Sequence, residues 1–118
     1  MEFLDELESL GVDVKEGLGR VMGDEDLYKM MLDMFLTSLQ SAPIHPEDFD
    51  GADLTDLIAK VHSLKGTTGN LSITPLFTRY MEALSLLRED RPAEAKKLYV
   101  ELVPIQETIV ACIQRHQQ

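Results

Sequence analysis

Residues 54–71 read LTDLIAKVHSLKGTTGNL, and this stretch decides the fold. Because a helix turns by about 100° per residue, residues three, four and seven positions apart share one face. Most apolar residues of the stretch, together with one threonine, fall within a sector of about 100° on such a helix. These stripe residues are Leu54, Leu57, Val61, Leu64, Thr68 and Leu71. The pattern predicts an amphipathic helix over about residues 52–70 that is buried along this stripe.

A second face of the same helix carries a histidine and a lysine. His62 lies about 100° from Val61 and therefore outside the stripe. Its neighbours on the helix surface, within about 60°, are Lys65, Gly66 and Gly69. A glycine inside a helix costs about 1 kcal/mol relative to alanine, so both glycines need a compensating reason. We interpret them as clearing space for a bulky partner to reach the imidazole; a tight crossing with a neighbouring helix is the alternative.

The rest of the chain is also helical in its periodicity, with no convincing strand. Apolar spacing and helix-breaking residues predict helices over about residues 3–10, 14–22, 24–39 and 74–89, and from 92 towards the C-terminus. The segment 41–50 contains two prolines and is predicted to be a loop.

Particular residues are expected to set the limits and faces of these helices. Gly11 should end the first helix, and Asp50 should cap the helix that carries His62. Pro104 should kink or split the last helix. The inward face of the 24–39 helix is expected to consist of Leu27, Met31, Met34, Phe35 and Leu39.

Together these helices predict an all-α fold. Four long amphipathic helices with short connections are typical of an up-down-up-down four-helix bundle, in which each apolar stripe is buried against the others. The short additional N-terminal helices would cover one end of the bundle. We expect this arrangement to hold the helix of His62 rigid while the imidazole stays in water.

Composition limits the possible partners. The chain of 118 residues suits one domain, and a hydrophobic content of 44% is enough for an ordinary core. The net charge of −10 argues against nucleic acid as a partner, because binding to its phosphates needs clustered Lys and Arg. No run of about 18 apolar residues occurs, which argues against membrane insertion, and the acidic start does not resemble a signal peptide. We therefore expect a cytoplasmic protein that binds other proteins.

Three further residues are expected to be structural. Cys112 is the single cysteine, so the chain has no internal disulfide, and its spacing is typical of a small buried core residue. His45 lies in the proline-containing loop and His116 in the polar tail, and both are expected on the surface. Histidines so placed have no metal-ligand spacing, and we expect no metal site.

One motif occupies the exposed face and the end of the central helix. It reads His62-Ser63-Leu64-Lys65-Gly66-Thr67-Thr68-Gly69-Asn70-Leu71-Ser72. This motif resembles the signature of histidine-containing phosphotransfer (HPt) domains, which is His-x-x-Lys-Gly, usually continued by a small residue, a Gly or Ser and another Gly. Segments 11–18 and 23–28 look like the usual opening of these domains. The resemblance implies a single HPt-like domain over residues 1–118 with a core at about 11–115.

Two positions depart from the family pattern. Family members commonly have a glycine where Ser72 stands. They also have a polar residue where Leu84 stands, and in relatives this residue helps to hold the histidine or its phosphate. Since Leu84 has no polar group, any such partner of the histidine must be another side chain.

The resemblance implies a chemistry for His62. It would accept a phosphoryl group from an aspartate of a receiver domain and pass it to another receiver in a phosphorelay. A neutral imidazole has one ring nitrogen with a free lone pair, so it needs no base to act as a nucleophile. Lys65 would stabilise the charge of the transferring phosphoryl group. Mg²⁺ is expected on the partner receiver, and this chain is expected to need no cofactor.

Docking of a receiver is expected to use apolar and small residues near the histidine, and the protein is expected to be a monomer. The candidate docking residues are Ile58, Ala59, Gly66 and Gly69.

The chain has no Gly-x-x-x-x-Gly-Lys-Ser/Thr loop, and no autonomous ATP-dependent kinase activity is expected. It would be a phosphocarrier with a covalent phosphohistidine intermediate. Whether such a carrier is called an enzyme is a matter of convention. Two alternatives remain open. The domain could be the phosphoacceptor module of a chemotaxis-type histidine kinase, phosphorylated from ATP by a separate catalytic domain, or a non-catalytic helical adaptor.

Overall fold

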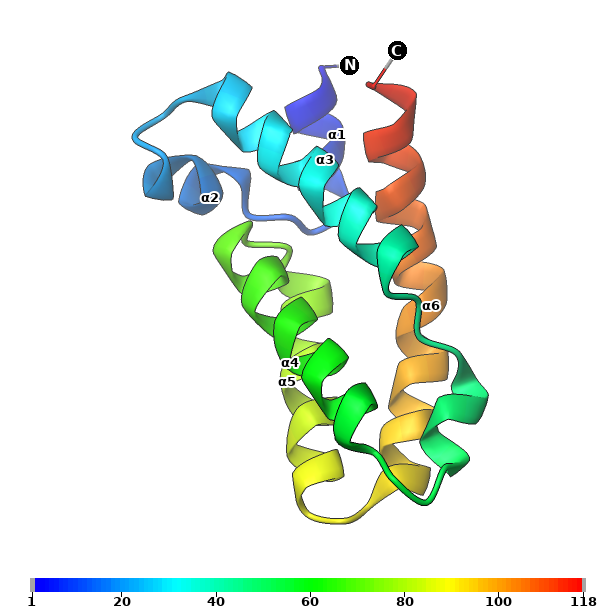
Figure 1. The fold of residues 1–118 in the computed structure, drawn as a ribbon. Coiled ribbons are helices and arrows are strands. Elements are labelled where there is room, and N and C mark those ends of the chain that lie inside the picture. Colours follow the sequence, from blue (N-terminus) through cyan, green and yellow to red (C-terminus); the bar gives the residue numbers. More distant parts are fainter. Residues whose placement is uncertain (1, 118) are drawn as a thin grey trace.

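The computed structural model describes residues 2–117, and within them the chain is all-helical, as predicted (Figure 1). The elements are α1 (Phe3–Ser9), α2 (Val14–Arg20), α3 (Glu25–Ser41), the 3₁₀ helix η1 (Pro46–Asp50), α4 (Thr55–Asn70), α5 (Thr74–Arg88) and α6 (Pro92–Arg115). The outermost residues of the predicted domain, 1 and 118, lie outside the described part. Among the described helices, none is both long and apolar enough to cross a membrane.

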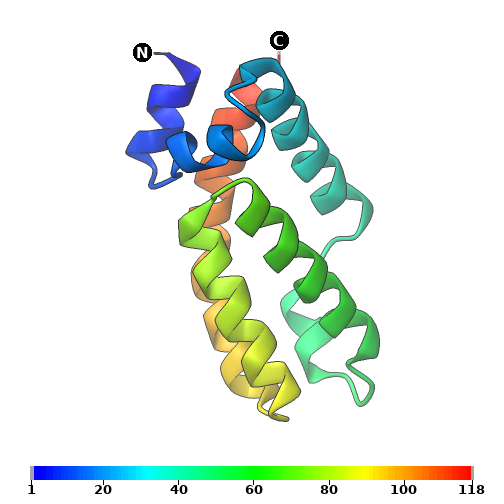
Figure 2. The same ribbon diagram turned by 90° about the vertical axis from the view of Figure 1, so that its left-hand side faces the viewer.

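The longest helix, α6, organises the molecule. It runs through most of the structure, whose dimensions are 44 × 25 × 23 Å. α4 and α5 lie side by side and antiparallel, and α5 packs along the first half of α6 (Figure 2). α1 and α3 pack against the second half of α6, so both chain ends lie at the same end of the molecule. α4 therefore has α5 on one side, with its exposed face free for solvent.

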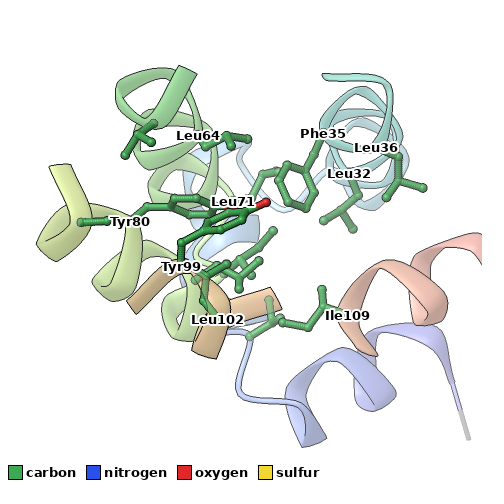
Figure 3. Packing of buried hydrophobic residues seen from close by; sticks show 14 of the residues in the cluster. Leu32, Phe35, Leu36, Leu64, Leu71, Tyr80, Tyr99, Leu102 and Ile109 are labelled. Carbon is green, nitrogen blue, oxygen red and sulfur yellow. The ribbon is translucent and has the colours of Figure 1, made fainter. Parts of the chain in front are cut away.

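The apolar stripe predicted for α4 is confirmed. Five of its residues are buried and Leu54 is half-buried. Side chains from α3, α4, α5 and α6 converge on this stripe in the interior (Figure 3). The one polar member, Thr68, is fully buried, and its hydroxyl donates to the carbonyl of Leu64 at 2.7 Å, so its burial leaves no donor unpaired.

The predicted helix limits are correct to within a few residues, but one predicted cap is wrong. α4 begins at Thr55, three residues later than expected, and the 3₁₀ helix η1 forms within the predicted loop. Asp50 belongs to η1 and forms an ion pair of 2.8 Å with Lys96 of α6. The carboxylate that serves the start of α4 is Asp53, which accepts the backbone N–H of Thr55 at 3.0 Å.

Two residues predicted to face inward on α3 do not. Leu27 is 38% exposed and Met34 is 61% exposed, whereas Phe35 is fully buried as predicted. The difference arises because α3 packs on α2 and α6, while the face that carries Leu27 and Met34 is left exposed. Apolar residues cover a wide arc of α3, and their spacing alone does not reveal which part of that arc packs against another helix.

The last helix is not split at Pro104. α6 continues from Pro92 to Arg115, although a proline inside a helix removes one backbone hydrogen bond. Leu102 and Ile109, on either side of Pro104, are buried against the core. Their burial offsets the cost of the missing hydrogen bond, so tertiary packing decides the continuity of this helix.

Candidate functional site

His62 lies on the exposed face of α4, one turn before Lys65. The imidazole is exposed and Lys65 is half-buried. Of the predicted docking residues, Ala59 and Gly66 are exposed, and Ile58 is half-buried against the core. The structure therefore places these residues on one accessible surface of α4 around the imidazole.

A cation from α5 reaches the imidazole. The Nη2 atom of Arg88 lies 3.5 Å from the Nδ1 atom of His62. Arg88 occupies the last turn of α5, one helical turn beyond Leu84, which is 2% exposed and belongs to the core. The sequence analysis did not identify Arg88. Because Arg88 lies one turn beyond Leu84 on α5, its long side chain can reach past the buried leucine to His62.

The contact between Arg88 and His62 is a weak one. Arginine only donates hydrogen bonds, so Nδ1 of His62 is the acceptor when this contact forms. A distance of 3.5 Å between exposed groups is at the long limit of a hydrogen bond. Such a contact is broken and re-formed at little cost, which leaves Arg88 free to turn towards an anion bound beside the ring.

The two glycines of the motif have different surroundings. A Cβ atom added at Gly66 would meet nothing within 4 Å, whereas one added at Gly69 would lie 2.9 Å from the ring of Phe77 on α5. Gly69 therefore fits the alternative explanation, a tight crossing with a neighbouring helix, because the missing side chain lets Phe77 pack against α4. At Gly66 the missing side chain opens space towards solvent, next to Lys65 and one turn from His62.

A shallow hollow adjoins the lysine side of this surface. It lies between α2, α4 and the start of α5, and its floor includes Gly66, Gly69 and Phe77. Three charged residues border it, namely Lys65, Glu16 and Arg20. The Arg20 guanidinium and the Glu16 carboxylate are 3.1 Å apart, so the two largely neutralise each other and Lys65 supplies the remaining positive charge.

Ser72 joins α2 to the turn between α4 and α5. Its φ of +56° lies in the left-handed region, which favours glycine. Ser72 is 2% exposed, accepts a hydrogen bond from Arg20, and donates one of 2.7 Å to Glu16. The Ser72 hydroxyl, and then the Arg20 guanidinium, hold the pKa of Glu16 below its usual value. These hydrogen bonds give a structural reason for a serine in a strained position.

The remaining histidines and the single cysteine have structural contacts. His45 precedes η1, and its backbone N–H donates to Asp48 at 2.8 Å. The His116 ring stacks on Phe3 with centroids 4.3 Å apart. Burial raises the pKa of the Cys112 thiol to about 11, so this thiol stays protonated and is a poor nucleophile. Among residues 2–117, no three His, Cys, Asp or Glu side chains are grouped to hold a metal ion.

No family model, curated protein or solved structure matches this chain. Its function must therefore be argued from the residues around His62.

Proposed function

We propose that this protein is a histidine phosphotransfer domain, which accepts a phosphoryl group on His62 from a receiver-domain aspartate and passes it to another receiver. The observation that carries the proposal is an exposed imidazole with Arg88 at 3.5 Å from Nδ1 and with Lys65 one turn farther along the same helix. The motif that resembles the HPt signature supports the same assignment.

The transfer begins with a neutral ring whose lone pair faces the phosphorus atom. Arg88 leaves Nδ1, and in the tautomer with its proton on Nδ1 the lone pair of Nε2 attacks the aspartyl phosphate. A nitrogen–phosphorus bond forms while the bond between phosphorus and the aspartate oxygen breaks, and the carboxylate leaves with the electron pair. The reverse sequence with a second receiver regenerates free His62.

Two cations suit this chemistry because the transition state spreads negative charge over three equatorial oxygens. An arginine offers two parallel N–H groups to phosphate oxygens, and a lysine offers a mobile point charge. Lys65 and Arg88 belong to different helices, so in this scheme they contact different oxygens of one phosphoryl group. Mg²⁺ is supplied by the receiver in this scheme.

The finer description of the fold belongs to the same proposal. We class α3, α4, α5 and α6 as an up-down-up-down four-helix bundle, with α1 and α2 as N-terminal additions; the antiparallel pairing of α4 with α5 and of α5 with α6 supports this class. Receivers as partners imply a cytoplasmic location. A monomeric carrier leaves the exposed surface around His62 open to each receiver in turn.

The test is intact-mass spectrometry after the protein is mixed with receiver domains that carry an aspartyl phosphate. We expect one acid-labile phosphoryl group on the wild type and on His45→Gln, a control at an exposed histidine of the loop, and none on His62→Gln. Labelling by a separate ATP-dependent kinase domain, but by no receiver, would favour the chemotaxis-type module. Absence of labelling from either source would leave the helical adaptor.

A further inference from the structure

The first helix, α1, lies at the edge of the molecule beside the last turns of α6 (Figure 2). It has seven residues, and a helix this short is not stable in water without tertiary contacts. Leu7 is fully buried. Three more apolar residues are half-buried against the core, namely Phe3, Leu4 and Leu10. α1 therefore stays helical only while it is packed on the rest of the molecule.

The connection after α1 joins a glycine to a fixed segment. Gly11 has a φ of +97°, in the left-handed region that favours glycine. Beyond it, Val12 is buried, and the backbone N–H of Asp13 donates to the carbonyl of Ser72 at 2.9 Å. The chain is thus anchored to the α4–α5 turn from Val12 onward. A rotation at Gly11 would move α1 and leave α2 in place.

The charge of α1 is offset at the end of α6. α1 and the residue before it carry four acidic side chains and no Lys or Arg, on a chain of net charge −10. Arg115 donates a hydrogen bond to the Glu6 carboxylate, and Nε2 of His116 lies 3.5 Å from its Oε2 atom. We call these contacts of Glu6 the α1 latch. Gln117 donates to Asp33 of α3 at 3.0 Å, which ties this end of α6 to the body of the molecule.

Cys112 belongs to the same face of α6 as the latch residues. It precedes Arg115 and His116 by three and four positions, so the three side chains share one helix face. The thiol is fully buried, and its pKa of about 11 is raised first by this burial and then by the nearby charge of Glu6. An exposed cysteine has a pKa of about 8.5 and reacts far more readily. Reaction of Cys112 therefore reports whether α1 is in place.

We propose that α1 is a hinged cover that opens as a unit at Gly11, that the α1 latch holds it shut, and that its opening exposes Cys112. The rest of the molecule keeps its packing, because α1 contacts mainly α6 and α2, whereas α4, α5 and α6 pack on one another. Local openings of this kind need less free energy than global unfolding and occur where an element has few neighbours. These residues lie outside the site around His62, so the proposal does not rest on phosphotransfer.

The latch depends on pH through Glu6. Burial alone would raise the pKa of Glu6, but the contacts with Arg115 and His116 outweigh it and hold this pKa below its usual value. The stabilisation by Glu6 is therefore full above pH 4.5 and is lost as the pH falls through the folded value. Two other titratable groups lie here, the Cys112 thiol, which stays protonated in acid, and Glu107, which borders the same groove between α1 and α6. Acid therefore weakens the latch.

Hydrogen exchange of the full chain, followed by NMR, measures the opening. At about pH 7 we expect the hydrogen-bonded amides of Glu6 and Leu10 to exchange at least about tenfold faster than those buried in α4 and α5. Iodoacetamide should alkylate Cys112 under the same conditions. Glu6→Gln should speed exchange in α1 and alkylation about threefold, whereas Glu8→Gln, the same change at an exposed position of α1, should alter neither. At about pH 3.5, exchange in Glu6→Gln should match the wild type, whose Glu6 is then protonated.

Arg115→Gln separates opening from a direct effect on the thiol. The charge of Arg115 lowers the pKa of Cys112, so its loss would slow alkylation if the thiol reacted with α1 in place. A weaker latch should instead speed alkylation about threefold. The proposal is wrong if α1 exchanges as slowly as α4 and α5, if Glu6→Gln and Glu8→Gln behave alike at about pH 7, or if Arg115→Gln slows alkylation. Alkylation that follows global unfolding in urea, and not the exchange of α1, would also overturn it.

Discussion

α3 and α4 are helices of 17 and 16 residues that expose opposite kinds of surface. α4 buries its apolar stripe and presents an imidazole, a lysine and a glycine, on a helix whose packing against α5 brings Arg88 to the same place. α3 buries one apolar face and presents a second one made largely of methionine. The difference teaches that the fold places a polar surface around His62 and an exposed apolar surface on two different helices, so that each can be altered without the other.

The largest expected effect concerns the buried face of α4. Leu64→Ala should lower the free energy of unfolding by about 2–5 kcal/mol, because it removes a core side chain that is 6% exposed and leaves a cavity. Met34→Ala on the exposed face of α3 should change it by about 0.5 kcal/mol or less. Urea denaturation of both variants measures the contrast. Equal losses of unfolding free energy would show that the side chain of Met34 is covered in solution.

Next in size is the effect of Arg88 on transfer. Arg88→Ala should slow phosphorylation by a receiver about tenfold, because one charge-assisted hydrogen bond to the transferring phosphoryl group is lost. Arg88→Lys should recover part of the rate, and Lys97→Ala, an exposed lysine of α6, should keep the wild-type rate. A wild-type rate for Arg88→Ala would remove this arginine from the site.

The two glycines of α4 offer a finer contrast within one helix. Gly66→Ala should raise the free energy of unfolding by up to about 1 kcal/mol, because its Cβ meets nothing and alanine favours the helix. Gly69→Ala should give no such gain, since its Cβ would lie 2.9 Å from the Phe77 ring and displace it. Thermal unfolding measures both effects, and equal gains would mean that Phe77 does not pack as described. If Gly66 clears space for a receiver, Gly66→Ala should slow phosphotransfer despite its greater stability.

The smallest expected effect is a pH dependence at the joint between α2 and the α4–α5 turn. The folded-state pKa of Glu16 is lowered from 4.5, so its stabilising contribution is full above that pH and is lost as pH falls through the folded value. Ser72→Ala removes the largest cause of the lowered pKa. Its unfolding temperature should therefore fall less than that of the wild type between about pH 6 and pH 3. An unchanged pH dependence would show that the Ser72–Glu16 hydrogen bond does not form in solution.

How far the sequence predicts this molecule depends on where the determining contacts lie. The stripe of α4, its exposed His62 and the helix limits follow from local periodicity and breaker residues, and the structure agrees with them. Arg88 could not be placed from sequence, because its approach to His62 depends on the register in which α5 packs on α4. The same register explains Gly69, whose neighbour Phe77 is close in space but belongs to another helix.

The error at Leu27 and Met34 has a related cause. Apolar periodicity records which residues are hydrophobic, but many apolar side chains of folded proteins stay exposed. It does not record whether a neighbouring element covers them. Pro104 shows the converse, since a local signal for a break is overridden by burial of the residues around it.

The most direct test of the central claim is a time course with two receiver domains. The first receiver carries an aspartyl phosphate, the second is unphosphorylated with Mg²⁺, and fragmentation mass spectrometry locates the phosphoryl group on this protein at each time. The account predicts that the modification rises and then falls on His62 alone while the second receiver gains it, and that His62→Gln blocks the transfer. Phosphate that never reaches this chain, or that reaches the second receiver equally well through His62→Gln, would contradict it.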